Sequence, residues 1–181
     1  MTSPARRARL EDVAAEVVEP VRRFLARRTD PATAEDVLAE VLLVCWRRLG
    51  EVPDAPLPWA YGVARHCLAN AERGARRQQR VAARVATVDP PATRVAGPGD
   101  DEPPAVEVVS EALATLPAKD AELLRLWAWE QLTPAEIALV LDLTPNAASI
   151  RLHRAREKLR EALRKNGLRA GHEGTTGRRK P

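Results

Sequence analysis

The sequence predicts an all-α protein, built as two small helical domains that are joined by a flexible linker. Aromatic residues make up only 3% of its 181 residues, while Ala, Leu, Arg and Glu dominate, so the composition favours helices over sheets. Apolar residues recur at spacings of three and four on both sides of one interruption. That interruption, residues 87–104, is rich in Pro, Gly and Asp, so it cannot continue a helix and offers few core residues.

The N-terminal domain is expected to span residues 10–86, behind a flexible N-terminus at residues 1–9. Its first helix follows an apolar spacing that begins at Leu10 and is kinked or restarted at Pro20. A second helix is expected from Thr33, where Asp36 three residues later completes a capping box, and Gly50 closes it.

A third, long helix is expected to open at Pro58, after a proline-rich loop, and to run to about Val85. Arginines form one stripe along it at spacings of three, one, three and four: Arg73, Arg76, Arg77, Arg80 and Arg84. Such a stripe suits a phosphate backbone. The upstream part carries Trp59, Tyr61, Arg65, His66 and Asn70, a mixture that suits unstacked bases. A core tryptophan and a solvated charged face would give the same pattern, so the residues alone leave both readings open.

The C-terminal domain is expected to span residues 105–164, with two helices that are separated at Pro117. Residues 133–136, Thr-Pro-Ala-Glu, then combine an N-cap, a proline at the first helical position and a capping glutamate. The pair Thr144-Pro145 repeats the start signal for a last helix to about Arg164. Residues 165–181 are basic and Gly-rich, and we expect a disordered tail there.

A short capped helix, a turn and a longer capped helix are typical of the helix-turn-helix, whose second helix enters the DNA major groove. If Leu152 faces the core, a step of roughly 100° per residue turns Ala147, Ile150, Arg151 and Arg154 outward. We expect DNA contacts from Thr133, Asn146, Ala147, Ser149, Ile150, Arg151, His153 and Arg154. A plain three-helix bundle with a solvated face is the alternative.

The composition also bears on the kind of partner and on the chemistry that the chain can perform. A net charge of +4 with clustered arginines favours a polyanionic partner. Cys45 and Cys67 lie in helical patterns without metal-ligand spacing, so we expect buried, inert thiols. No signal peptide or membrane-length apolar run is present, which predicts a cytoplasmic protein without membrane insertion. We expect no metal, no cofactor and no enzymatic activity.

In its first half the chain resembles the extracytoplasmic-function (ECF) sigma factors of bacterial RNA polymerase, in which sigma regions 2 and 4 are joined by a linker. Residues 34–40, Ala-Glu-Asp-Val-Leu-Ala-Glu, are similar to the family's acidic region 2.2 helix. Residues 58–66 resemble its Trp-Leu-Tyr and Ile-Ala-Arg-Asn pattern, and residues 70–80 resemble the basic end of the promoter-melting region.

The resemblance implies two sets of contact residues in this half. A contact with the coiled coil of the polymerase β′ subunit would involve Asp36, Val37, Glu40, Val41, Leu43 and Val44. A contact with the promoter −10 element would involve Trp59, Tyr61, Arg65, His66, Asn70, Arg73, Arg76, Arg77 and Arg80. His66 and Asn70 would lie near the base that is flipped out.

In the second half, residues 113–117, 132–138 and 151–156 resemble the strongest local signature of region 4. The resemblance implies that the helix-turn-helix binds the −35 element and that this domain contacts the polymerase β flap. The whole chain would then bind core RNA polymerase and direct promoter recognition, −10 melting and transcription initiation. An anti-sigma factor is a candidate partner.

Several positions depart from the family pattern. Ala39 stands in place of a usual Gln in the polymerase-binding helix, and His66 in place of a usual Asn. Asp142 replaces the usual Gly of the turn, while Ser149 and Ile150 stand where Lys and Ser are frequent. The last two imply a promoter preference of the chain's own.

Two other classes of function remain open. A stand-alone transcription regulator could read DNA with the same helix-turn-helix and use the N-terminal helices for dimerisation or ligand binding. An enzyme could be imagined around Asp36, Glu40, His66 and Cys67, but the sequence lacks a nucleophile elbow, a metal spacing and a phosphate-binding glycine loop.

Overall fold

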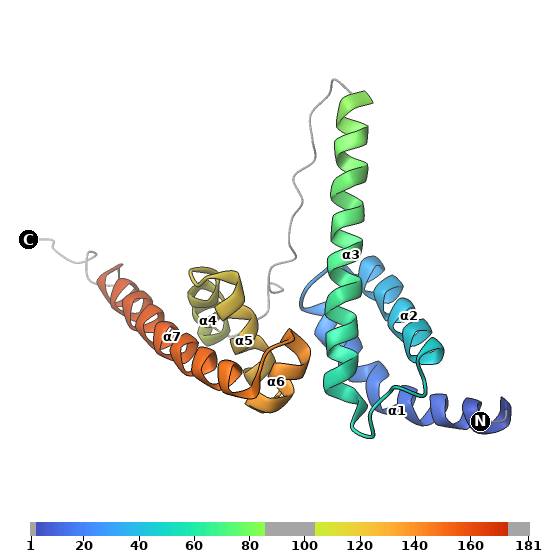
Figure 1. The fold of residues 1–181 in the computed structure, drawn as a ribbon. Coiled ribbons are helices and arrows are strands. Elements are labelled where there is room, and N and C mark those ends of the chain that lie inside the picture. Colours follow the sequence, from blue (N-terminus) through green and yellow to red (C-terminus); the bar gives the residue numbers. More distant parts are fainter. Residues whose placement is uncertain (1–2, 86–103, 174–181) are drawn as a thin grey trace, which may run out of the picture. The chain divides into compact units, whose positions relative to one another are not determined.

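The structure is a computed structural model that describes residues 3–85 and 104–173 (Figure 1). Within these ranges the chain forms seven α-helices and no strand, which confirms the all-α prediction. The chain divides into two compact units. The first unit contains α1 (Ser3–Ala26), α2 (Pro31–Arg47) and α3 (Pro56–Val85), and the second contains α4 (Pro104–Ala114), α5 (Ala118–Ala128), α7 (Pro145–Glu173) and most of α6 (Pro134–Leu141). The expected linker, residues 87–104, lies outside the described residues except for Pro104.

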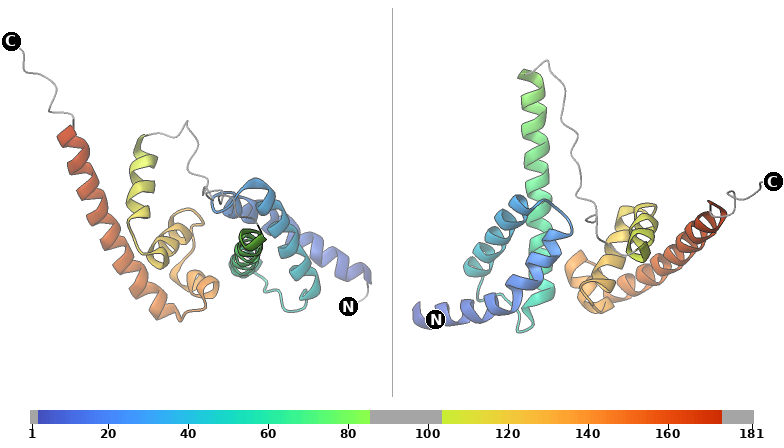
Figure 2. Two further views of the ribbon diagram at one scale, coloured as in Figure 1. Left: turned by 90° about the horizontal axis from the view of Figure 1, so that it is seen from above. Right: turned by 180° about the vertical axis from the view of Figure 1, so that it is seen from behind.

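The first unit is a bundle of three helices that pack against one another in every pairing. Its core consists of apolar side chains from all three: Val13, Val17, Val21, Phe24 and Leu25 of α1, Val37, Leu38, Val41 and Cys45 of α2, and Ala60, Tyr61, Ala64, Cys67 and Leu68 of α3. The first turns of α3 contribute to this core, but its residues 72–80 do not, because the helix continues well past the ends of α1 and α2 (Figures 1 and 2).

The first helix is longer and more continuous than the sequence predicts. α1 begins at Ser3, so residues 3–9 are helical and not the expected flexible stretch. It also passes through Pro20 without ending there. Proline removes one backbone N–H from a helix, but the turns on either side of it are fixed by Val17 and Val21, which are both fully buried. Burial of these side chains therefore offsets the lost hydrogen bond.

The start of α2 corrects a second prediction. Asp30, not Thr33, is the N-cap, because the Asp30 carboxylate accepts a hydrogen bond of 3.0 Å from the Thr33 backbone N–H. Pro31 then occupies the first turn, where its missing N–H costs nothing. The expected capping box of Thr33 and Asp36 is therefore wrong, and the Asp36 side chain is exposed.

The second unit is organised around α7, which packs against both α4 and α5. Its core includes Leu113, Leu123, Leu124, Leu126, Ile137, Ala148, Leu152 and Ala155. The helix extends to Glu173 and not to about Arg164, so much of the expected disordered tail has helical backbone. Residues 174–181 lie outside the described residues. None of the described helices combines the length and the apolar character that a membrane span requires.

Both cysteines are buried in the first unit, as expected. Burial raises the pKa of the Cys67 thiol to about 11, with a further contribution from the neighbouring Glu40 carboxylate. Burial also raises the pKa of Cys45. Both thiols therefore stay protonated near neutral pH, and protonated thiols are poor nucleophiles and poor metal ligands.

Candidate functional site

The outer face of α2 carries acidic and apolar side chains together. Asp36, Glu40 and Leu43 are all exposed, Leu43 at 44%. At roughly 100° per residue, these three positions fall within about 60° of one another around the helix. We call them the acidic face of α2. A surface of this kind suits a protein partner that offers cations around an apolar patch.

The other predicted contact residues of α2 lie elsewhere on the helix. Val37 and Val41 point to the opposite side and belong to the core, with 2% and 0% of their surface exposed. Val44 is half-buried, between the exposed side of α2 and the core. The three-four spacing that makes α2 amphipathic turns Val37 and Val41 inward, so they are core residues here. Their contact with the polymerase stays a prediction.

The sequence interpretation missed Trp46, which extends this surface toward the end of α2. Its side chain is 38% exposed, and the Arg6 guanidinium lies over its ring at 4.7 Å from the centroid. Arg6 also donates a hydrogen bond of 2.8 Å to the Trp46 backbone carbonyl. Residues 6 and 46 are forty positions apart, so no local pattern reveals this pair.

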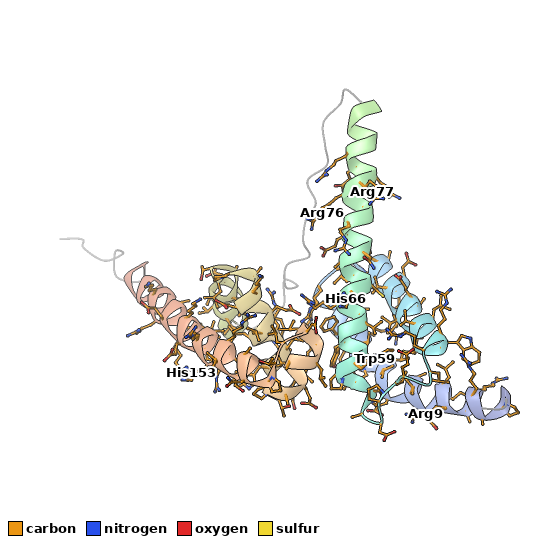
Figure 3. The ribbon with its side chains drawn as sticks, viewed as in Figure 1. Arg9, Trp59, His66, Arg76, Arg77 and His153 are labelled. Atoms are coloured by element: carbon orange, nitrogen blue, oxygen red, sulfur yellow. The ribbon has the colours of Figure 1, made fainter. Side chains whose placement is uncertain are left out.

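One face of α3 collects most of the residues that were predicted to contact the −10 element. With the same angular step, Trp59, His66, Asn70, Arg73, Arg76, Arg77 and Arg80 lie on a single side of the helix. We call this set the α3 face. It runs for about 31 Å at 1.5 Å per residue. Trp59 and His66 lie on the part that packs in the bundle, whereas Arg76 and Arg77 lie on the part that extends past it (Figure 3).

Tyr61 does not share the α3 face. Tyr61 is 3% exposed, and its ring lies 5.1 Å from that of Phe24 in the core. Tyr61 lies two residues after Trp59, and two residues along a helix turn a side chain by roughly 200°, so its ring faces the core. Its contact with the −10 element stays a prediction. Arg65 is half-buried and lies at the edge of the face, roughly 20° from Arg76 around the helix. Trp59 is half-buried, while His66 and Asn70 are exposed.

The arginines of the α3 face differ in their partners. Arg73 donates a hydrogen bond to the Asn70 side-chain oxygen, and Arg76 forms an ion pair of 3.2 Å with Glu72. Within the described part of the chain, Arg77 and Arg80 have no hydrogen-bond or ion-pair partner, and both are exposed. A phosphate group would reach these two guanidinium groups without displacing an existing contact. The side chain of Arg84, the last arginine of the predicted stripe, is outside the described residues.

The second cationic surface is on α7, and it is held in place by the core behind it. Ala148, Leu152 and Ala155 are buried, so the opposite side of the helix is turned to solvent. That side, which we call the α7 face, presents Asn146, Ala147, Ile150, Arg151 and Arg154. All of them are exposed except Ala147, which is half-buried. Ser149 and His153 are exposed at its edges, and His153 lies 3.6 Å from Glu157.

The two helices of the helix-turn-helix start as the sequence predicts. Thr133 donates its hydroxyl hydrogen to Glu136 at 2.7 Å, and the Glu136 backbone N–H donates back to that hydroxyl at 3.3 Å. The Thr133 backbone N–H also donates to the Glu136 carboxylate at 2.8 Å, which completes the capping box. Thr144 caps α7 in the same way, since its hydroxyl accepts from the Ala147 N–H at 3.2 Å. In the turn between them, Asp142 has a φ of 53°, which explains why Gly is usual there.

Two tryptophans of the second unit have exposed side chains. Trp127 is 37% exposed and lies under the Arg156 guanidinium at 4.3 Å. Trp129 is 40% exposed. An open groove of about 510 Å³ lies beside them, lined by Trp127, Ala128, Gln131, Leu132, Thr133 and Pro134.

Comparison with known proteins identifies this arrangement. The family model for sigma-70, region 4, matches residues 107–159, which include the helix-turn-helix. The chain is 34% identical over 157 residues to the RNA polymerase sigma factor CarQ of Myxococcus xanthus, covering 84% of this chain and 88% of CarQ. It is 30% identical over 162 residues to the ECF RNA polymerase sigma factor SigD of Mycobacterium tuberculosis, covering 82% of this chain and 76% of SigD.

Solved structures have the same fold. The sigma factor RpoE of Bartonella quintana, crystallised with the anti-sigma factor NepR, has a TM-score of 0.60 at 18% identity and covers 85% of this chain and 96% of its own. CnrH, in complex with the cytosolic domain of CnrY, has a TM-score of 0.55 at 22% identity, with 88% and 89% covered. Together with the sequence relatives, these matches place the chain in the ECF family of RNA polymerase sigma factors.

Proposed function

We propose that the chain carries out sigma-factor function through three surfaces: the acidic face of α2 binds core RNA polymerase, the α3 face binds the −10 element, and the α7 face reads the −35 element. The observation that carries this proposal is the separation of charge. Asp36 and Glu40 lie beside the exposed Leu43 on the outer side of α2, while two cationic faces lie on two different units. Acidic residues repel the DNA backbone, so that surface suits a protein, whereas the cationic faces suit phosphates.

The division within the α3 face supports separate roles for its two ends. Trp59, His66 and Asn70 offer an aromatic ring, an imidazole and an amide, which can stack on or hydrogen-bond to unpaired bases. Arg77 and Arg80 offer charge without a partner among the described residues, which suits the phosphates of the adjoining strand. The face would thus bind opened bases at one end and backbone at the other, as −10 melting requires.

The α7 face has the residue types for reading bases in a major groove. Asn146 and Arg154 can hydrogen-bond to base edges, the small Ala147 permits close approach, and Ile150 can pack against a thymine methyl group. Leu152 behind this face fixes the helix in the unit. We expect the protein to act in the cytoplasm, because the polymerase and the chromosome are there. An anti-sigma factor that covers the acidic face of α2 would block the polymerase contact.

The test of the polymerase contact exchanges charge at two matched pairs of positions. In the variant Asp36→Lys plus Glu40→Lys, we expect loss of binding to core polymerase and of promoter-directed transcription in vitro. The control is Asp12→Lys plus Glu16→Lys, which changes two exposed acids with the same spacing on α1 and should leave both activities intact. Equal loss in the two variants, or none in either, would contradict the assignment of the acidic face.

The alternative, a stand-alone regulator, makes a different prediction in the same assay. Such a protein would protect an operator from nuclease without polymerase and would be indifferent to charge reversal on α2. Transcription with core polymerase over genomic DNA, with mapping of the start sites, would at the same time identify the promoter sequence that the chain selects.

A further inference from the structure

The N-terminal turns of α1 make contacts that the sigma-factor assignment does not explain. Arg6 lies over the Trp46 ring at 4.7 Å and donates a hydrogen bond of 2.8 Å to the Trp46 carbonyl. Farther along, Arg9 donates to the Pro53 carbonyl at 3.5 Å and lies 3.7 Å from Asp54. Residues 3–9, which we call the N-terminal arm, are thus attached to the end of α2 and to the loop that follows it.

The Arg6 contact acts on two parts of Trp46 at once. The Trp46 carbonyl belongs to the last turn of α2, where backbone oxygens have no partner within the helix. Arg6 supplies that partner, and its guanidinium plane also restrains the indole ring. The Trp46 side chain is 38% exposed, so a contact over its ring limits its freedom to rotate. A single residue therefore fixes both the helix end and the orientation of an exposed aromatic ring.

Trp46 is adjacent to the acidic face of α2. Leu43, three residues earlier and 44% exposed, lies next to it on the helix surface. Leu43 and Trp46 together form an apolar patch beside Asp36 and Glu40. Exposed tryptophans that are already fixed in orientation are efficient anchors in protein interfaces, because little side-chain freedom is lost when the partner binds.

We propose that Trp46 is a further contact residue for core RNA polymerase and that Arg6 is a positioning residue that holds it ready for binding. The polymerase-binding surface would then extend from Asp36 to Trp46 and would depend on the N-terminal arm. This inference rests on the proposed role of the acidic face of α2. It adds an aromatic anchor to that face and gives the first turns of α1 a function.

The experiment measures the dissociation constant of the full-length chain for core polymerase. We expect Trp46→Ala to weaken binding about tenfold or more, as for an interface anchor, and Trp46→Phe to recover most of the loss. Arg6→Ala should weaken binding about two- to fivefold, the size expected for an exposed cation over a ring. Because Arg6 acts through Trp46, the double variant should bind no more weakly than Trp46→Ala alone.

The matched control is Arg7→Ala. Arg7 belongs to the same arm but is 80% exposed, and its ion-pair partner among the described residues is Glu11 at 3.0 Å, so its removal should leave binding unchanged. A melting curve of each variant separates folding from binding. The inference is overturned if Trp46→Ala binds normally, if Arg6→Ala binds like Arg7→Ala, or if the losses of Arg6→Ala and Trp46→Ala add. Arg6→Ala that melts earlier but binds normally would mark Arg6 as a helix cap alone.

The variant Asp36→Lys plus Glu40→Lys distinguishes failure of this inference from failure of the proposed function. If charge reversal abolishes binding while the Arg6 and Trp46 variants bind normally, only the inference fails. If charge reversal is harmless while the Trp46 variants lose affinity, the acidic assignment fails and the aromatic anchor stands.

Discussion

The two cationic helices of this protein are supported in opposite ways. Leu152 and the buried alanines on either side of it tie the α7 face to the core of its unit. In α3, every residue from Glu72 to Arg80 is exposed, so no described side chain packs against this segment. One cationic face is thus the outer side of a packed helix, and the other is a helix with solvent on all sides.

The difference indicates what each face can recognise. Direct reading of bases requires donors and acceptors at fixed positions, which a core-backed helix provides. Phosphate binding tolerates variation in position, since the charge of the backbone is continuous along the strand. The stability of a polar, solvated helix also depends on the helix propensity of its residues and on ion pairs along it, such as that of Glu72 with Arg76. We therefore expect the two faces to respond differently to the same kind of mutation.

The largest expected effect is on α7. Leu152→Ala should destabilise the second unit by about 2–5 kcal/mol, because it removes a core side chain and leaves a cavity. Ile150→Ala changes an exposed residue two positions away and should alter stability by less than about 0.5 kcal/mol. Thermal unfolding followed by circular dichroism measures both, and similar melting curves for the two variants would show that α7 is not held by its core.

The next effect separates base reading from phosphate binding. Arg154→Ala should cost about 1–3 kcal/mol on the preferred −35 sequence and relax the preference there. Arg77→Ala should weaken the binding of polymerase holoenzyme to all promoters by a similar factor. It should also reduce the salt dependence of that binding by about one phosphate contact. Binding titrations across a range of salt concentrations distinguish the two. If Arg77→Ala changes the sequence preference instead, the phosphate role of the α3 face is wrong.

A smaller effect concerns the cap of α6. Thr133→Ala should destabilise the second unit by about 1 kcal/mol. The hydrogen bonds from Thr133 hold the pKa of the Glu136 carboxyl below its usual value of 4.5. The stability that these bonds contribute is therefore fully present above that pH, and it is lost as the pH falls through the lowered pKa of the folded state. Stability measured between pH 6 and 3 should therefore fall less steeply for Thr133→Ala than for the natural chain; parallel curves would argue against this role of the cap.

The smallest expected effect is on the solvated part of α3. Ala75→Gly should lower local helix stability by about 1 kcal/mol, but it should leave the melting temperature of the first unit unchanged because Ala75 touches no core. Amide hydrogen exchange should be faster at residues 72–80 only. A lower melting temperature would show that this segment contributes to the fold after all.

The parts of the fold that the sequence predicts are those that local residues determine. The capping box of Thr133 and Glu136 involves partners three residues apart, so its pattern could be read directly. At the start of α2 the predicted Thr33 cap was wrong, because the Asp30 carboxylate caps the helix and Pro31 takes the first helical position. The prediction followed the capping-box pattern and so placed the boundary too late.

The candidate site was harder to predict where contacts join distant segments. The predicted contact residues included Val37, Val41 and Tyr61 because these stand inside the family motifs. Helical spacing already turns all three toward the core and away from the exposed residues of the same motifs. Trp46 was missed for another reason. Its partner Arg6 comes from a stretch that was expected to be flexible, and only packing of α1 on α2 brings the two residues together.

The turn at Asp142 has a consequence for anyone who surveys substitutions in this protein. With a φ of 53°, this position favours Gly, Asn and Asp over other residues, whatever the surroundings of the side chain. A mutational scan would therefore report an exposed residue between the two helices of the helix-turn-helix as intolerant. That intolerance would imitate a nucleic-acid contact, although it would arise from the main chain alone.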